Sequence, residues 1–185
     1  MQSSEFSYTA GNFIRYIPGT YHETYFILEY NNFIIELCMD KIYFYNLINE
    51  NDKFIIKNEV TKGINIYGCI INEILYVNNF SQGKILIIEL NNKIIKKDIN
   101  TFKSENIFSL ITWNENYIIS TDKKYKFLYI IDIIQRKIIN KISTKNNPVY
   151  IKKINLDKDI YHTENILLIM DDKLKFEFWI RINNI

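Results

Sequence analysis

The stretch GINIYGCIINEILYVNNFSQGKILIIELNNKIIKKDI (63–99) decides the fold. It holds four short runs rich in isoleucine and tyrosine, at 63–71, 73–77, 84–90 and 93–99. β-Branched and aromatic residues favour extended strands, and the asparagine, glycine and lysine residues between the runs favour tight turns. The stretch therefore predicts four consecutive strands that pair as one antiparallel sheet.

The same pattern of four runs recurs along the chain. Tyr45, Ile88, Ile131 and Trp179 fall at equivalent points of successive units, with spacings of 43, 43 and 48 residues. Periods of about 40 to 50 residues are typical of β-propellers and other repeat arrays. We therefore expect an all-β chain of four units, at about 24–59, 63–99, 107–143 and 149–182.

The stretch FLYIIDIIQRKIINKI (127–142) is ambiguous, because its apolar spacing is also compatible with a helix. Its high isoleucine content favours strands, since β-branched side chains pack well on a pleated surface. The repeat also requires two strands here. We therefore predict two strands with a break at Gln135 and Arg136.

Fragments of a known repeat motif occur at equivalent points of the units. Trp179 ends a third run without a following aspartate, and Asp132 ends another without a preceding tryptophan. Acidic residues stand in the turns before third runs, and a glycine and a histidine precede the first unit, at Asp40, Asp122, Asp172, Gly19 and His22. In this pattern, over nearly its whole length, the chain resembles the WD-repeat family of β-propellers.

The resemblance implies a β-propeller, or an arc of one, with about four four-stranded antiparallel blades, occupying residues 11–185 after a flexible segment at 1–10. Propellers of this family typically close when the N-terminus supplies the outer strand of the last blade. The run at 12–17 is suited to this, because the last unit has only three strand-like runs. A closed four-blade ring and an open arc completed by another propeller segment are both compatible with the count.

Composition excludes several classes of protein. The formal net charge of +2 gives no strong field for nucleic acid, and arginine occurs only at Arg15, Arg136 and Arg181. No uncharged apolar run approaches the roughly 18 residues of a membrane span, and no signal peptide is recognisable. Cys38 and Cys69 are far apart, without a CxxC partner, which favours buried reduced thiols. We expect a cytoplasmic protein.

No catalytic, metal or cofactor site is expected. A hydrolytic propeller would need two carboxylates close together at its channel, and the first strands contribute Glu29 alone. His22 and His162 have no second ligand at a suitable spacing, so a zinc site is not indicated. The glycines never approach phosphate-loop spacing.

The resemblance implies a non-catalytic scaffold for protein–protein interaction. The segment DKKYKF (122–127) joins positive charge to an aromatic residue in a turn, where partners of propellers most often bind. We expect the partner-binding residues to be Tyr21, His22, Lys123, Lys124 and Tyr125, with the lysines paired to an acidic partner segment. Alternatives are a phosphoinositide-binding propeller, which would need paired arginines, an RNA-binding one and, less favoured, a hydrolase.

Overall fold

The computed structural model describes residues 24–49, 53–56, 63–91, 94–100, 107–122, 124–154, 166–171 and 173–179. These residues form four antiparallel sheets, in each of which the strands follow one another in chain order. Sheet 1 contains β1 (Thr24–Tyr30), β2 (Phe33–Cys38), β3 (Lys41–Asn46) and β4 (Lys53–Ile56). Sheet 2 contains β5 (Asn65–Ile71), β6 (Ile74–Asn79), β7 (Lys84–Glu89) and β8 (Ile94–Asn100), with the 3-10 turn η1 (Phe80–Gln82) between β6 and β7.

Sheets 3 and 4 continue the same order. Sheet 3 contains β9 (Ile107–Thr112), β10 (Tyr117–Asp122), β11 (Phe127–Asp132) and β12 (Lys137–Ser143). Sheet 4 contains β13 (Pro148–Ile154), β14 (Ile166–Asp171) and β15 (Phe176–Trp179). The expected all-β architecture is confirmed, and the ambiguous stretch at 127–142 forms two strands rather than a helix.

The register of the strands repeats from sheet to sheet. Tyr45, Ile88, Ile131 and Trp179 each pair with the second residue of the preceding strand, namely Ile34, Leu75, Ile118 and Leu167. The four positions inferred from sequence spacing are therefore structurally equivalent.

A residue in the left-handed conformation precedes the third strand of each sheet, and these residues are spaced 43, 43 and 48 apart, like the equivalent positions above. The φ angles are 60° at Asp40, 60° at Gly83, 55° at Lys126 and 59° at Leu174. Glycine adopts this conformation at no steric cost, whereas other L-residues are strained there by about 1 to 2 kcal/mol. Lys126 and Leu174 therefore carry a steric cost at this turn position that Gly83 does not.

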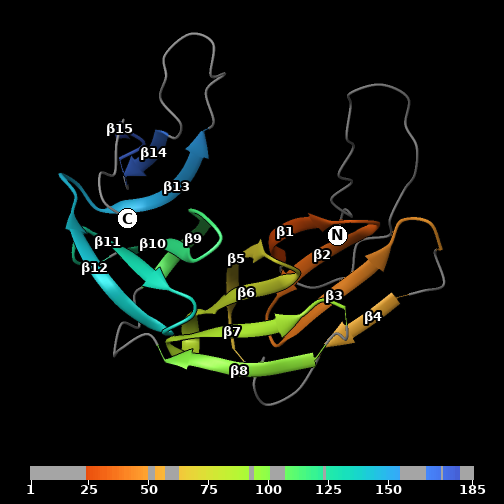
Figure 1. Cartoon of the computed structure of the whole chain (residues 1–185). Helices are drawn as coiled ribbons and strands as arrows, with labels where there is room; N and C mark the ends of the chain where they lie inside the picture. Colours follow the sequence, from red (N-terminus) through yellow and green to blue (C-terminus); the bar gives the residue numbers. More distant parts are fainter. Residues whose placement is uncertain are drawn as a thin grey trace, which may run out of the picture.

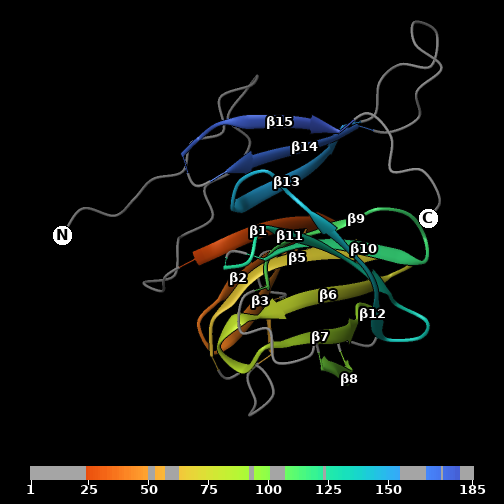
Figure 2. The same ribbon diagram turned by 90° about the vertical axis from the view of Figure 1, so that its left-hand side faces the viewer.

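The four sheets form an arc whose inner edge is made by their first strands. β1 contacts β5, β5 contacts β9, and β9 contacts β13, whereas no comparable contact joins β13 to β1 in the part of the chain that the structure describes. Figure 1 shows sheets 1 and 4 at the two ends of this arc, in orange and blue. Figure 2 shows β6, β7 and β8 following β5 outward in order.

Apolar side chains fill the spaces between neighbouring sheets. In β7, Leu86 and Ile88 pack toward sheet 1, whereas Ile85 and Ile87 pack toward sheet 3. Because sheet 2 is covered on both faces, β7 is a continuous apolar run rather than an alternating one. A third cluster joins sheets 3 and 4 and includes Leu128, Ile151 and Leu167.

Polar side chains also connect the sheets. The buried Asn65 donates from Nδ2 to the carbonyl of Cys38 at 2.9 Å. Asn78, 1% exposed, donates to the carbonyls of Ile107 at 2.7 Å and Phe108 at 3.1 Å. Such bonds satisfy backbone groups that would otherwise be buried without partners between the sheets.

The strand expected at 12–17 lies outside the described residues, and so does the segment at 1–10. Sheet 4 has three strands among the described residues, so its pairing with 12–17 stays a prediction. Within the described part of the chain there is no apolar helix of membrane-spanning length.

Replacing Asn78 by alanine should lower the free energy of unfolding by about 2 kcal/mol, because a buried and a part-buried carbonyl of β9 would both lose their donor. Urea unfolding followed by circular dichroism measures this change. The control is Asn116→Ala, at an exposed turn position, for which we expect a change below about 0.5 kcal/mol. Equal effects of the two substitutions would contradict a bridging role for Asn78.

Candidate functional site

One edge of sheets 3 and 4 is built from three segments that are separate in sequence. They are the β10–β11 turn, the β12–β13 linker and the β14–β15 turn. The Thr144 N–H donates to the Lys126 carbonyl at 2.8 Å, which joins the first turn to the linker. Pro148, the first residue of β13 directly after the linker, pairs with Asp171, where the last turn begins. The three segments therefore form one continuous surface.

Asp122 shapes the β10–β11 turn. Its Oδ1 accepts the backbone N–H groups of Lys124 at 2.8 Å and Tyr125 at 3.1 Å. Its Oδ2 accepts the O–H of Tyr129, which reaches back from the middle of β11. Both carboxylate oxygens of this fully buried residue are thus occupied.

Tyr129 is held protonated by its surroundings. Burial raises the pKa of Tyr129, and its hydrogen bond to the Asp122 carboxylate raises that pKa further. A protonated phenol is the form that donates to a carboxylate. The pair therefore anchors the turn that carries Lys124 and Tyr125.

Asp171 shapes the β14–β15 turn in the same way. Its Oδ1 accepts the N–H groups of Lys173 at 2.9 Å and Lys175 at 2.8 Å. Asp172, the turn acid that the sequence predicts for this unit, lies outside the described residues, so that prediction stays untested. Because Asp171 ends β14 as Asp122 ends β10, the residue equivalent to Asp122 is Asp171.

This edge presents positive charge to solvent. Five of its described lysines are exposed, namely Lys124, Lys126, Lys145, Lys173 and Lys175. The carboxylates of Asp122 and Asp171 are buried beneath them. Three large apolar side chains are exposed on the same edge, with exposed fractions of 51% for Tyr125, 71% for Leu174 and 60% for Phe176. We call residues 124–126, 145–146 and 173–176 the basic turn edge.

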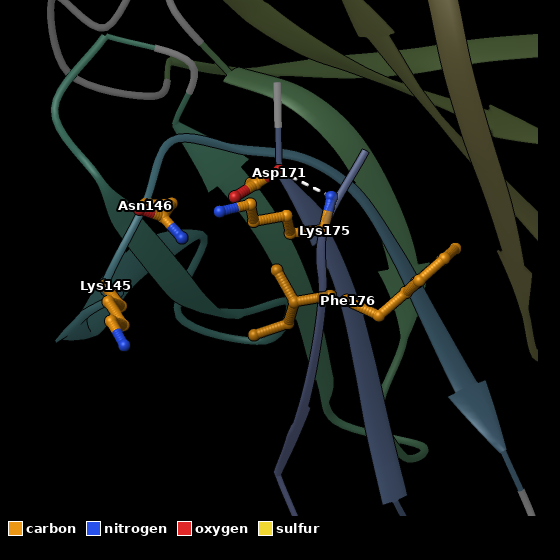
Figure 3. Close-up of a pocket in the computed structure, with 6 residues that line it drawn as sticks. Lys145, Asn146, Asp171, Lys175 and Phe176 are labelled. Atoms are coloured by element: carbon orange, nitrogen blue, oxygen red, sulfur yellow. Dashed lines mark hydrogen bonds between the residues drawn. The ribbon is translucent and has the colours of Figure 1, made fainter. Parts of the chain in front are cut away.

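A pocket of about 310 Å³ opens in the basic turn edge. Its walls come from the linker and from β14 and β15, and its lining residues are Lys145, Asn146, Ile169, Asp171, Lys175 and Phe176. Figure 3 shows the Asp171 carboxylate directed toward the space between Asn146 and the side chain of Lys175. The pocket thus combines one buried acceptor, two ammonium groups and an apolar wall.

Two of the five residues expected to bind a partner lie on this edge. Lys124 and Tyr125 are exposed, and Lys124 Nζ lies 5.0 Å from the centre of the Tyr125 ring. Tyr21, His22 and Lys123 lie outside the described residues, so their placement stays a prediction. The linker and the β14–β15 turn were not predicted as parts of the binding surface. The repeat offers a signal for the second of them, because it makes 171–175 equivalent to 122–127.

Of the catalytic candidates, the structure describes Cys38, Cys69 and Glu29, whereas His22 and His162 lie outside the described residues. Burial raises the pKa of Cys38 to about 12, and the nearby Glu36 carboxylate adds to that rise. Burial likewise raises the pKa of Cys69 to about 12. Both thiols are free and stay protonated at neutral pH, as expected for core cysteines. Glu29 is exposed on β1, and no cluster of three metal-ligating side chains occurs within the described ranges.

No protein-family model and no curated protein matches this sequence. Solved structures with a similar fold include the WD40 repeats of RRP9, with a TM-score of 0.63 and 10% identity over 87% of this chain and 52% of that one. BBS1N, in complex with ARL6DN, has a TM-score of 0.60 and 9% sequence identity, and the match covers 82% of this chain and 47% of that one. Apo AztD from Citrobacter koseri has a TM-score of 0.60 and 15% sequence identity, and the match covers 79% of this chain and 43% of that one.

These similarities show the fold alone, because sequence identity is so low. The chain spans about half the length of the structures that it matches. The similarity to these solved structures, together with the arrangement of the four sheets in an arc, shows that the chain has a β-propeller fold.

Replacing Tyr129 by phenylalanine should destabilise the protein by about 2 kcal/mol at neutral pH, because the Asp122 carboxylate would lose a buried donor. Since the folded-state pKa of Tyr129 is raised, this stabilisation is complete below the unfolded tyrosine pKa of about 10 and is lost as the pH rises above it. The difference between wild type and variant should therefore narrow above pH about 10. Thermal unfolding at a series of pH values measures it.

The matched control for this prediction is Tyr125→Phe, which removes an exposed phenol from the same turn. We expect its effect to be below about 0.5 kcal/mol at every pH. A Tyr129→Phe protein as stable as the Tyr125→Phe protein would show that the hydrogen bond to Asp122 contributes nothing.

Proposed function

We propose that this chain is a non-catalytic, WD-repeat-like propeller scaffold that binds an acidic segment of a partner protein at the basic turn edge. The observation that carries the proposal is the separation of charge there. Among the residues that the structure describes in these turns and the linker, five lysines are exposed, whereas the aspartates Asp122 and Asp171 are buried. The edge therefore attracts negative charge although the whole chain has a net charge of only +2.

The apolar side chains on this edge support protein as the ligand. Tyr125, Leu174 and Phe176 are large and exposed, and they stand among the lysines. Interfaces combine apolar anchors, which provide most of the affinity, with charged groups that steer association and set specificity. Turns held on a rigid sheet scaffold are also where binding residues concentrate.

Another propeller segment that completes the ring is a second partner within this proposal. It is supported by the ends of the arc, where β1 and β13 have no comparable contact in the described part of the chain. Ile27 and Ile55, on sheet 1, are about half exposed, at 50% and 44%. This chain matches about half the length of longer propeller structures, which also supports completion of the ring by another segment. A cytoplasmic location belongs to the proposal as well.

A polyanion such as RNA or a phosphoinositide is the alternative ligand, since the same lysines would attract phosphate. The described residues favour it less. Arg136, the arginine among them, lies in the β11–β12 turn, at the opposite edge of sheet 3. Phosphate recognition commonly uses bidentate arginines, and RNA recognition uses stacked aromatic residues on the same surface.

Charge reversal on the basic turn edge tests the proposal. The probe is the peptide acetyl-Glu-Glu-Tyr-Glu-Glu-amide, whose affinity is measured by isothermal titration calorimetry. The double variant Lys145→Glu and Lys173→Glu should weaken binding by at least about tenfold, because two attractive charges become repulsive. Binding to wild type should also weaken as salt is raised, since exposed charges are screened.

The control double variant, Lys137→Glu and Lys152→Glu, makes the same change in net charge at exposed positions away from the three turns. It should retain the affinity of wild type within about twofold. An equal loss in both double variants would contradict a localised site. An RNA octamer or inositol hexakisphosphate that binds more tightly than the peptide would favour the alternative ligand.

A further inference from the structure

Asp171 and Asp122 occupy equivalent positions but differ in one hydrogen bond. Each ends a second strand, and each uses Oδ1 to accept two N–H groups of the following turn. Asp122 Oδ2 also accepts the O–H of Tyr129. Asp171 is 4% exposed, and its Oδ2 is buried with no hydrogen-bond donor from any described residue.

The register explains the difference. Tyr129 lies opposite Ser120, two residues before Asp122, and the equivalent position opposite Ile169 is occupied by Glu177. Glutamate is not a hydroxyl residue, so the described part of sheet 4 has no counterpart of the Tyr129 phenol at this register position. A buried acceptor left without a donor destabilises the fold, and a donor from a ligand would remove that penalty.

We propose that the pocket beside Asp171 receives the phenol of a tyrosine from an acidic partner segment, with the phenol O–H donating to Asp171 Oδ2. This inference rests on the proposed function and names the residue that the basic turn edge selects. The pocket of about 310 Å³ is at the lower end of the range for ligand sites, which suits one side chain. Ile169 and Phe176 provide an apolar wall for the ring.

The charges of the pocket select a neutral donor. Lys145 and Lys175 both line it, so the ammonium or guanidinium group of a partner would be repelled on its way to Asp171. A phenol carries no charge, and acidic residues that flank it would meet the lysines. Figure 3 shows the Lys175 side chain alongside Asp171. Because this lysine is exposed, it can change rotamer quickly to admit the ring.

A pair of peptides tests the inference. Acetyl-Glu-Glu-Tyr-Glu-Glu-amide and the same peptide with phenylalanine in the centre differ by one hydroxyl group. The tyrosine peptide should bind wild type about tenfold more tightly, as expected for a hydrogen bond to a charged acceptor. The preference should fall below about threefold in Asp171→Asn, which keeps an oxygen for the turn N–H groups but removes the charged acceptor.

The matched control is Asp132→Asn, which makes the same change at an aspartate that caps the β11–β12 turn on the opposite edge. It should keep the tenfold preference. Equal binding of both peptides to wild type, or a preference that persists in Asp171→Asn, would overturn the inference and leave the proposed function standing. Binding of neither peptide would overturn both.

A variant that supplies the missing donor within the chain provides a second test. Glu177→Tyr places a tyrosine at the register position of Tyr129. It should raise the thermal midpoint and abolish the preference for the tyrosine peptide, because Asp171 Oδ2 is then occupied. An unchanged midpoint with an unchanged preference would show that Asp171 does not accept a phenol.

Discussion

Hydrogen bonds from side-chain amides and hydroxyls to the backbone of the next sheet hold the arc in one geometry. Asn65 reaches back to sheet 1, Asn78 reaches forward to sheet 3, and Thr112 Oγ1 donates to the carbonyl of Ile70 at 3.2 Å. Apolar packing between sheets is nondirectional and would tolerate sliding. These bonds are directional, so they fix how far each sheet is shifted against its neighbour, and the position of every turn at the edge follows from that shift.

The strands could be predicted from the sequence because strand formation here depends on local composition. Continuous runs such as KILIIEL mark strands of sheets covered on both faces, and the spacing of 43 residues located their equivalents. The stretch at 127–142 was assigned to strands from its isoleucine content together with that spacing, since its local pattern also suits a helix. Its break is where predicted, with Arg136 in the left-handed conformation at φ 56°.

The basic turn edge could be predicted only in part, because it depends on contacts between units. Lys124 and Tyr125 were found from a single turn, but Lys145 and Lys175 join them only through the pairing of the linker with both turns. The equivalence of Asp171 to Asp122 follows only from the strand register, because composition cannot say which of two adjacent carboxylates ends the strand. The bridging role of Asn78 had no signal in the sequence, since asparagine beside a strand ordinarily indicates a turn.

The order of strands in the sheets bears on how the chain acquires its structure. Every strand of a described sheet pairs with a neighbour in sequence, so no sheet has to wait for a distant segment before it can form. Hairpins of this kind close with little loss of chain entropy and form early in folding. During synthesis, each completed sheet can serve as a template on which the next one condenses as it leaves the ribosome, and the arc can grow one blade at a time.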